Sequence, residues 1–265
     1  MKAINYDKFR WQICGGLKVI ALLFGLQQGF TKYCFLICEW DSRARFLHYS
    51  RRDWPSRKSL KRGIMNVEDH PLVEPSKIVL SSMHLKLGLM KHFEKVMNQE
   101  EAAFTYLREK FPRLSEAKLK KGIFIGPQIR ILIKDEYFDK LLQGDEKAAW
   151  NSFKFVVKEF LGNRRAQNYE ELVNTLLQSY HKLGSKMSLK CTSFTRICIF
   201  PQRLWCSDWW TGERFHQDIS SMEKRHQGKW NCVLLTDCCW LWQGMPLSWN
   251  TSDKQNGRKN LFCLC

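Results

Sequence analysis

A series of helix-like segments between residues 84 and 184 constrains the fold of this chain more than any other feature. Apolar residues recur there at every third or fourth position, which is the period of a helix with one buried face. The segment HLKLGLMKHFEKVM, for example, places on one stripe Leu85, Leu89, Phe93 and Val96. Five such segments in succession predict that the middle of the chain is mostly helical.

Start and stop signals divide this region into separate helices. In LSEAKLKKG, Ser115 is a helix cap and Gly122 follows where a helix would stop. The longer stretch GPQIRILIKDEYFDKLLQG has Pro127 in its first turn. It contains no further glycine or proline before Gly144, so we expect one continuous helix.

The last two segments carry similar signals. NYEELVNTLLQSYHKLG begins at the cap Asn168, has acids in its first turn and stops at Gly184. DEKAAWNSFKFVVKEFLG stops at Gly162. We expect its buried face to consist of Ala149, Phe153, Val156, Val157 and Phe160.

The periodicity changes on both sides of the helical region. The apolar run Val19–Leu23 in ICGGLKVIALLFGLQQG predicts a buried strand that turns into a helix. Residues 51–80 contain three prolines and little periodicity, which predicts a loop. After residue 190 neither period persists, and residues 191–265 contain 15 of the 22 Trp and Cys residues. Within that part only GERFHQDISSMEKRHQG has a helical period.

These changes predict three regions. Residues 1–64 form a strand and helix with a basic loop, residues 65–190 form a helical domain, and residues 191–265 form a degenerate segment with one helix at 212–228. The expected fold class is therefore α+β and mostly helical.

The net charge of +17 favours a polyanionic partner, either nucleic acid or an acidic membrane surface. Three rings, Phe46, Tyr49 and Trp54, interleave with the densest basic run, SRARFLHYSRRDWPSRKSLKR. Its cations are Arg43, Arg45, Arg51, Arg52, Arg57, Lys58, Lys61 and Arg62. Cations among flat rings can neutralise phosphates and stack on bases, but a solvated basic loop has the same composition. We expect nucleic acid, and DNA before RNA, as the partner, with no membrane and no small-molecule substrate.

The cysteines and the N-terminal apolar run indicate an intracellular protein. The eleven cysteines are odd in number and irregularly spaced, which favours free thiols in a reducing compartment, nuclear or cytoplasmic. VIALLFGL resembles the apolar part of a signal peptide, but Asp7 and Lys18 and the lack of a prompt cleavage site argue against secretion.

Six stretches carry a resemblance to a known class of sequences: GLKVIALLFGLQQGFTKYC, CEWDSRAR, MHLKLGLMK, GIFIGPQIR, FLGNRRAQNY and GERFHQDISSMEKRHQGKW. They resemble multicopy, transposon-derived reading frames of animal genomes, similar in layout to cut-and-paste transposases with an RNase H-like core of the DDE type. The likeness covers roughly residues 11–190 and 207–240. It implies a remnant of an RNase H-like sheet with a large all-helical insertion.

In such transposases three acids hold two Mg²⁺ or Mn²⁺ ions, which activate water and stabilise the leaving oxygen. The resemblance implies that the first acid lies on a strand upstream of Met1 and that the second occupies the position of Gly16. The third is expected at Glu213 in GERFHQD, the catalytic candidate of this chain. Glycine has no side-chain ligand, and one glutamate cannot hold two cations. We therefore expect no catalysis and no bound cofactor.

The relatives also carry a possible zinc site, formed by a C-x-x-C and by histidines after SLK. CFLIC retains Cys34 and Cys38, but Phe35 stands at a ligand position and CTSFTRICIF has no histidine. Buried free thiols are the expected state. The irregular flanks of GERFHQDISSMEKRHQGKW are interpreted as frameshifted, because one-base shifts of suitable codons bring them close to the relatives.

Three functions remain open. The chain is an inactive transposase fragment, a basic helical module that the host has reused to bind nucleic acid, or a metal-dependent enzyme. The last would use two E-x-x-H pairs, Glu213 with His216 and Glu223 with His226, a spacing found in di-iron bundles. Those bundles place their pairs on different helices, whereas these two pairs lie on one expected helix.

Overall fold

The computed structural model describes residues 12–29, 31–51, 53–162, 165–192, 194, 204–205, 224–227, 233, 237 and 261–264. The chain divides into two compact units. The sheet unit comprises Met1–Arg43, Trp54–Ser81 and Gln202–Cys265, and the helical unit comprises Ala44–Asp53 and Ser82–Pro201. The fold is α+β and mostly helical, as the sequence predicts.

Within its described residues, the sheet unit contains four short parallel strands in the order β3-β2-β1-β4. They are β1 (Gln12–Gly15), β2 (Ile78–Ser81), β3 (Leu204–Trp205) and β4 (Leu261–Leu264). Ile13 of β1 lies opposite Ile78 of β2, and Gln12 lies opposite Leu261 of β4. All four residues of β2 are buried, as expected for a parallel strand with both faces covered.

The run Val19–Leu23 is helical, so the prediction of a strand there was wrong. The strand ends earlier, at Gly15, and helix α2 (Leu17–Leu23) follows directly. Val19, Ile20 and Leu23 are buried because the spacing of three and four residues places them on one side of a helix. A run that is apolar at nearly every position fits either structure, and here the helix has its own buried face.

The predicted loop at residues 51–80 is irregular over most of its length, but it ends in regular structure. The 3-10 turn η3 (Pro75–Lys77) leads into β2. The loop also packs on the end of α2. Leu26 forms an antiparallel bridge with Val67, and the carbonyl of Gly25 accepts hydrogen bonds from the N–H groups of Glu68 and Asp69.

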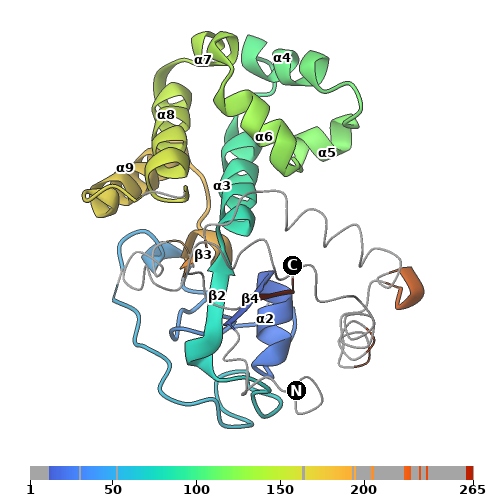
Figure 1. Ribbon diagram of the computed structural model, residues 1–265. Helices are drawn as coiled ribbons and strands as arrows, with labels where there is room; N and C mark the ends of the chain where they lie inside the picture. Colours follow the sequence, from blue (N-terminus) through green and yellow to red (C-terminus); the bar gives the residue numbers. More distant parts are fainter. Residues whose placement is uncertain are drawn as a thin grey trace, which may run out of the picture. The chain divides into compact units, whose positions relative to one another are not determined.

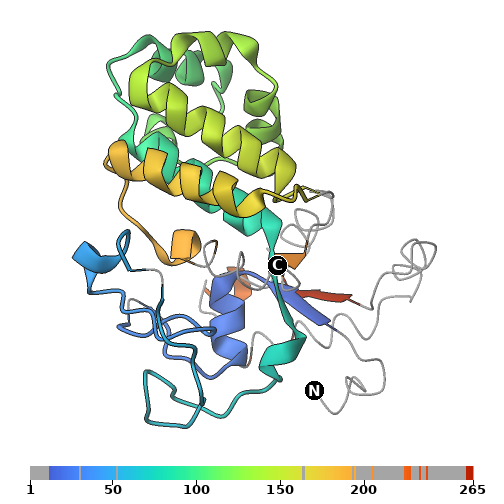
Figure 2. The same cartoon turned by 90° about the vertical axis from the view of Figure 1, so that its left-hand side faces the viewer.

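The long stretch of the helical unit begins at Ser82, and its described residues contain seven α-helices. They are α3 (Ser82–Val96), α4 (Ala102–Lys110), α5 (Glu116–Lys120), α6 (Gly126–Ile133), α7 (Glu136–Leu141), α8 (Gly144–Glu159) and α9 (Tyr169–Lys182). Helices α8 and α9 lie side by side (Figures 1 and 2). The 3-10 turn η2 (Arg45–Leu47) also belongs to this unit.

The core of the helical unit is built around aromatic rings. The ring of Trp150 on α8 lies 5.3 Å from Phe93 of α3, 5.1 Å from Phe138 of α7 and 5.5 Å from Phe153, between centroids. All four rings are fully buried. Edge-to-face and tilted pairs at such distances add stability beyond the area that they bury.

The stripes predicted for these helices are largely confirmed. Leu85, Leu89 and Phe93 are buried on α3, and the last position, Val96, is half-buried. On α8 the predicted face is buried except for Val157, which is half-buried. Trp150 was not predicted as core, although it is completely covered.

The single helix predicted between Pro127 and Gly144 is in fact two helices, so this prediction was wrong. Asp135 separates α6 from α7, because its side chain accepts hydrogen bonds from the N–H groups of Tyr137 and Phe138 and starts a new helix. An aspartate in this position competes with helix continuation by satisfying the next free N–H groups.

The two units differ from the three predicted regions. The long stretch of the helical unit starts at Ser82 rather than at residue 65, because residues 78–80 pair with β1 as part of strand β2. The predicted helix at 212–228 lies outside the described residues except for 224–227. Within the part of the chain that the structure describes, no helix is both long and apolar enough to cross a membrane.

Candidate nucleic-acid interface

The basic run predicted as a binding surface is shared between the two units. The sheet unit contains five of its cations: Arg43, Arg57, Lys58, Lys61 and Arg62. Arg45 and Arg51 belong to the helical unit, and Arg52 lies outside the described residues. The run is therefore continuous in sequence but does not form one structural element.

The exposed members of the run have almost no acidic partners. Five cations of the run are exposed, and none of them forms an ion pair within the described ranges. They are Arg43, Arg45, Lys58, Lys61 and Arg62. Arg51 differs, because its Nε lies 3.7 Å from Oδ1 of Asp53. An exposed pair of this kind contributes little to stability. The sheet-unit cations are thus free to face an anionic partner.

Arg57 has a structural position instead. Its side chain donates hydrogen bonds to three backbone carbonyls, those of Phe35 at 3.1 Å, Met65 at 3.1 Å and Tyr33 at 2.8 Å. Partial burial lowers the pKa of its guanidinium below the ordinary value. The bonds join residues 33–35 to Arg57 and to Met65, so Arg57 holds the segment that carries Lys58, Lys61 and Arg62.

The three rings expected to stack on bases do not share one environment. Phe46 is 83% exposed, whereas Trp54 is only 7% exposed and belongs to the core. Tyr49 is half-buried; its hydroxyl donates to the carbonyl of Ser185, and its ring stacks on His181 at 4.5 Å. Of the three, Phe46 alone presents its ring to solvent.

Gly16 follows β1 immediately and is the N-cap of α2. Its φ of −66° and ψ of 153° are accessible to any residue, so the backbone does not require glycine here. The carboxyl end of a parallel strand is where open α/β sheets place ligands. An acid at this position would therefore lie at the edge of the sheet where such folds bind their ligands.

The other candidate ligands are only partly described. Glu213, His216 and Glu223 lie outside the described residues. Nε2 of His226 lies 2.8 Å from Oδ2 of Asp237. No group of three or more His, Cys, Asp or Glu side chains suited to a metal occurs among the residues described.

The cysteines of CFLIC are free thiols. Cys38 is buried and forms an antiparallel bridge with Ser56, and Cys34 is half-buried. Burial raises the pKa of Cys34, which keeps its thiol protonated.

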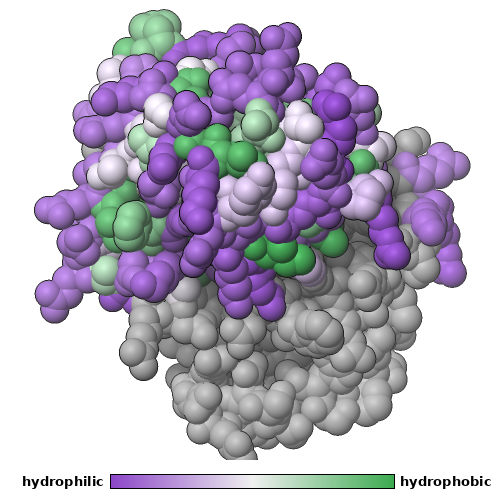
Figure 3. Space-filling view, turned by 90° about the horizontal axis from the view of Figure 1, so that it is seen from above, coloured by the Kyte–Doolittle hydropathy of each residue, from purple (hydrophilic) through white to green (hydrophobic). Residues whose placement is uncertain are grey.

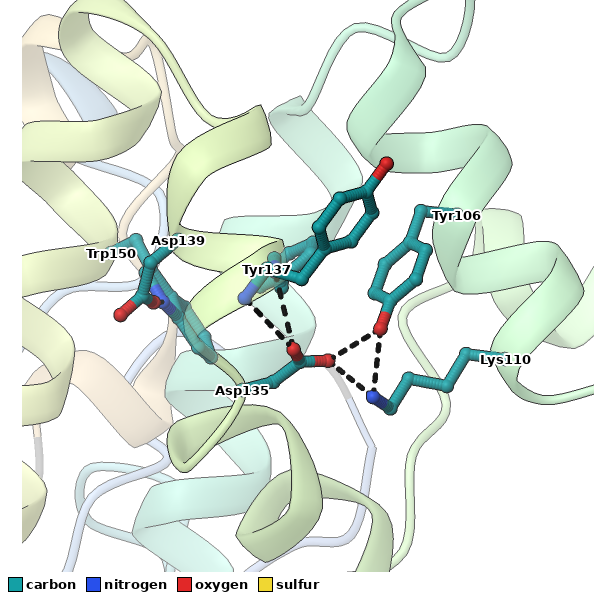
Figure 4. Close-up of polar contacts among 7 residues, drawn as sticks. Tyr106, Lys110, Asp135, Tyr137, Asp139 and Trp150 are labelled. Atoms are coloured by element: carbon teal, nitrogen blue, oxygen red, sulfur yellow. Dashed lines mark hydrogen bonds and ion pairs between the residues drawn. The ribbon is translucent and has the colours of Figure 1, made fainter.

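A polar cluster around Asp135 was not predicted from the sequence (Figure 4). The Asp135 carboxylate accepts from the Tyr106 hydroxyl at 2.8 Å, from the N–H of Tyr137 at 3.1 Å and from the N–H of Phe138 at 3.3 Å, and it pairs with the Lys110 ammonium. Tyr106 and Lys110 come from α4, so the cluster ties α4 to the start of α7. Both oxygens of the carboxylate have hydrogen-bond donors, which is typical of a structural contact. The pattern D-E-Y-F, an acid at a cap followed by an acid in the first turn, could have indicated this helix start.

The surface above α4 to α7 is mostly hydrophilic, with smaller hydrophobic patches between the polar side chains (Figure 3). Large exposed apolar residues of this unit include Ile123, Ile125, Ile131 and Tyr137. Scattered apolar side chains are ordinary on a protein surface, and these assign no partner.

Two families of domains match the chain, and both are described as domains of unknown function. DUF8703 matches residues 1–73 and DUF8704 matches residues 82–162. The second match starts at Ser82, the first residue of α3 and of the long stretch of the helical unit. Neither match covers half of the chain. No curated protein and no solved structure matches it.

Proposed function

We propose that this chain is a catalytically inactive, transposase-derived protein that binds nucleic acid, DNA in preference to RNA, inside the cell, in the nucleus or the cytoplasm. The observation that carries the proposal is the unpaired basic loop of the sheet unit. Arg43, Lys58, Lys61 and Arg62 are exposed and have no ion pair within the described residues. The chain as a whole has 43 Lys and Arg against 26 Asp and Glu.

The position of Gly16 supports the inactive state. The resemblance places a metal-binding acid there, and the residue lies at the carboxyl end of β1 with a backbone that an aspartate could adopt. The parallel pairing of β1 with β2, and the helix that directly follows β1, are compatible with an RNase H-like remnant. With glycine in this position the chain lacks a ligand for a two-metal reaction.

Arg57 supports the use of the loop as a binding element. A flexible basic loop would lose conformational freedom on binding, which weakens affinity. Hydrogen bonds from Arg57 to the carbonyls of Tyr33, Phe35 and Met65 fix the chain on both sides of Lys61 and Arg62. The neighbouring cations are thus partly preorganised.

The test is the salt dependence of nucleic-acid binding by the full-length chain, measured by fluorescence anisotropy with duplex DNA and with RNA. A variant with Arg43, Lys58, Lys61 and Arg62 replaced by Gln should bind more weakly. The slope of log K against log salt should become less steep by up to about 0.9 for each phosphate that the variant no longer neutralises. Arg57 remains unchanged in this variant because its replacement would disturb the loop.

The matched control removes four exposed charges elsewhere, namely Lys140, Lys147, Lys158 and Lys182. Both variants have the same net charge, so a general charge effect would weaken both equally. Equal affinities for the two variants, or no binding of the unchanged chain at low salt, would refute the proposal.

A further inference from the structure

A second group of cations surrounds a hydrogen bond in the helical unit. Nε2 of His92, on α3, lies 2.6 Å from Oγ of Ser188, which precedes a short helical stretch at 189–192. Ser188 Oγ also accepts the N–H of Cys191 at 3.4 Å and donates to Cys191 Sγ at 3.7 Å. The 2.6 Å contact joins the two side chains in either tautomer of the ring.

Three lysines lie close to this pair. Lys91 and Lys95 flank His92 on α3, four residues apart and hence on the same face of the helix. Lys190 follows Ser188 by two residues, and its side chain runs across α3 at Gly88. A Cβ atom at Gly88 would lie 2.4 Å from Cδ of Lys190, so glycine at this position makes room for the lysine.

The lysines act on one another and on the histidine. Burial, followed by the charges of Lys95, Lys190 and Lys91, lowers the pKa of His92 to about 4. Burial and the charge of Lys91 also lower the pKa of Lys190. His92 is therefore neutral at pH 7, first because it is buried and further because of the surrounding positive charge.

No acid compensates this charge within the described residues. None of the three lysines forms an ion pair there. Glu94 lies near Lys95, but it is 1% exposed, and burial raises its pKa to about 8. Its carboxyl group is mostly protonated at pH 7 and contributes little negative charge.

We propose that Lys91, His92, Lys95, Ser188 and Lys190 form a binding site for a phosphate group. The lysines supply the charge, and the imidazole adds positive charge and a second N–H donor once an anion lets it take up a proton. A phosphate has negative charge and several acceptor oxygens. Both match a set of cationic hydrogen-bond donors such as this one. We assign the phosphate to a nucleic-acid backbone; this part rests on the proposed function, whereas the phosphate chemistry does not.

The first experiment follows the titration of His92 by NMR in the full-length chain, with and without inorganic phosphate or a short DNA oligonucleotide. An opposite charge within about 4–6 Å shifts a pKa by one unit or more, so each ligand should raise the pKa of His92 by about that amount. The response should disappear in Lys95→Gln with Lys190→Met, in which methionine keeps the packing on Gly88. It should persist in Lys147→Gln, an exposed lysine on α8.

The second experiment measures the affinity for DNA of a Lys91→Gln, Lys95→Gln double variant, which leaves Lys190 and its packing intact. We expect weaker binding and a salt slope lower by up to about two units. A pKa of His92 that neither ligand changes would overturn the site. A phosphate response together with undiminished DNA affinity would overturn the nucleic-acid assignment and leave both the phosphate site and the function of the basic loop standing. A phosphate response with no DNA binding by the unchanged chain would refute the proposed function while the phosphate site stands.

Discussion

The hydroxyl of Tyr106 donates a 2.8 Å hydrogen bond to Oδ2 of Asp135, and the same oxygen receives the Lys110 ammonium. The other oxygen caps the first turn of α7. One carboxylate thus joins two helices and starts one of them. Desolvation opposes its ionisation, but the hydrogen bonds from Lys110 and Tyr106 hold the pKa of Asp135 below its ordinary value.

Replacement of Asp135 by Ala should lower the free energy of unfolding by about 1–3 kcal/mol, since it leaves a lysine and a tyrosine hydroxyl without their partner. The measurement is denaturation by urea. Asp145→Ala, an exposed acid in the first turn of α8, is the control. Equal losses in the two variants would mean that the cluster adds nothing beyond a helix-terminal charge.

The same carboxylate predicts a loss of stability in acid. Its folded pKa lies below the unfolded value, so its contribution is complete above an unfolded pKa of about 3.9 and is lost as the pH falls through the folded value. Unfolding curves recorded between neutral pH and strongly acidic pH should show this loss in the unchanged chain and a smaller one in Asp135→Asn. A loss of the same size in both would assign the acid sensitivity to other carboxyl groups.

Glu94 predicts a pH dependence of the opposite sign. Both of its oxygens are buried without a hydrogen-bond partner in the described part of the chain. Burial raises its pKa from 4.5 to about 8, so the folded state keeps a proton that the unfolded state loses. The free energy of unfolding should therefore fall as the pH rises from 4.5 to 8.

Glu94→Gln should remove this dependence and stabilise the chain at pH 8 by about 1–3 kcal/mol, with little effect at pH 4. Denaturation at both pH values is the measurement, with the exposed Glu109→Gln as control. A Gln variant that is less stable than the unchanged chain at pH 8 would show that the carboxylate is ionised and paired.

Gly25 should tolerate no side chain. Its φ is +61°, and a Cβ atom would lie 2.1 Å from the carbonyl oxygen of Asp69. Gly63 has a φ of +81° but open space around it. Gly63→Ala should cost about 1–2 kcal/mol for the left-handed backbone alone, and Gly25→Ala clearly more. Thermal unfolding of the two variants compares them directly, and equal costs would show that the loop at Asp69 moves freely.

Gly16→Asp should leave the chain unable to cleave DNA. The substitution adds one acid at the end of β1, and the backbone at residue 16 can accommodate an aspartate. Two metal ions, however, need further carboxylates. Nicking of supercoiled plasmid with Mg²⁺ or Mn²⁺ is the measurement. Nicking by the unchanged chain that Glu213→Gln abolishes would contradict the inactive state.

Local signals in the sequence were sufficient to predict most helices of the helical unit. Helix α9 follows its cap Asn168 and ends near Gly184, and the apolar faces of α3 and α8 are largely where the periodicity placed them. The break at Asp135 was missed because only glycine and proline were taken as stops. The local signal for α2 was ambiguous, since Val19–Leu23 is apolar enough for a buried strand.

The candidate sites depend on contacts between distant residues, and a single sequence does not specify these. Arg57 reaches carbonyls 22 and 24 residues earlier in the chain, and His92 meets a serine 96 residues later. A basic run indicates that cations are present; it does not tell which of them are held by backbone oxygens. No periodic pattern in the sequence indicates the role of Arg57 or the grouping of three lysines around His92.

The pairing of Gln12 with Leu261 has a consequence for the order of events during synthesis. The helices from α3 to α9 lie in one continuous stretch of the chain, so they can pack while the ribosome is still translating the last strand. The sheet must wait for its last strand, since its contacts have a high sequence separation and form slowly. Until β4 is made, β1 has an unpaired edge, and an apolar strand with an unpaired edge is prone to aggregate.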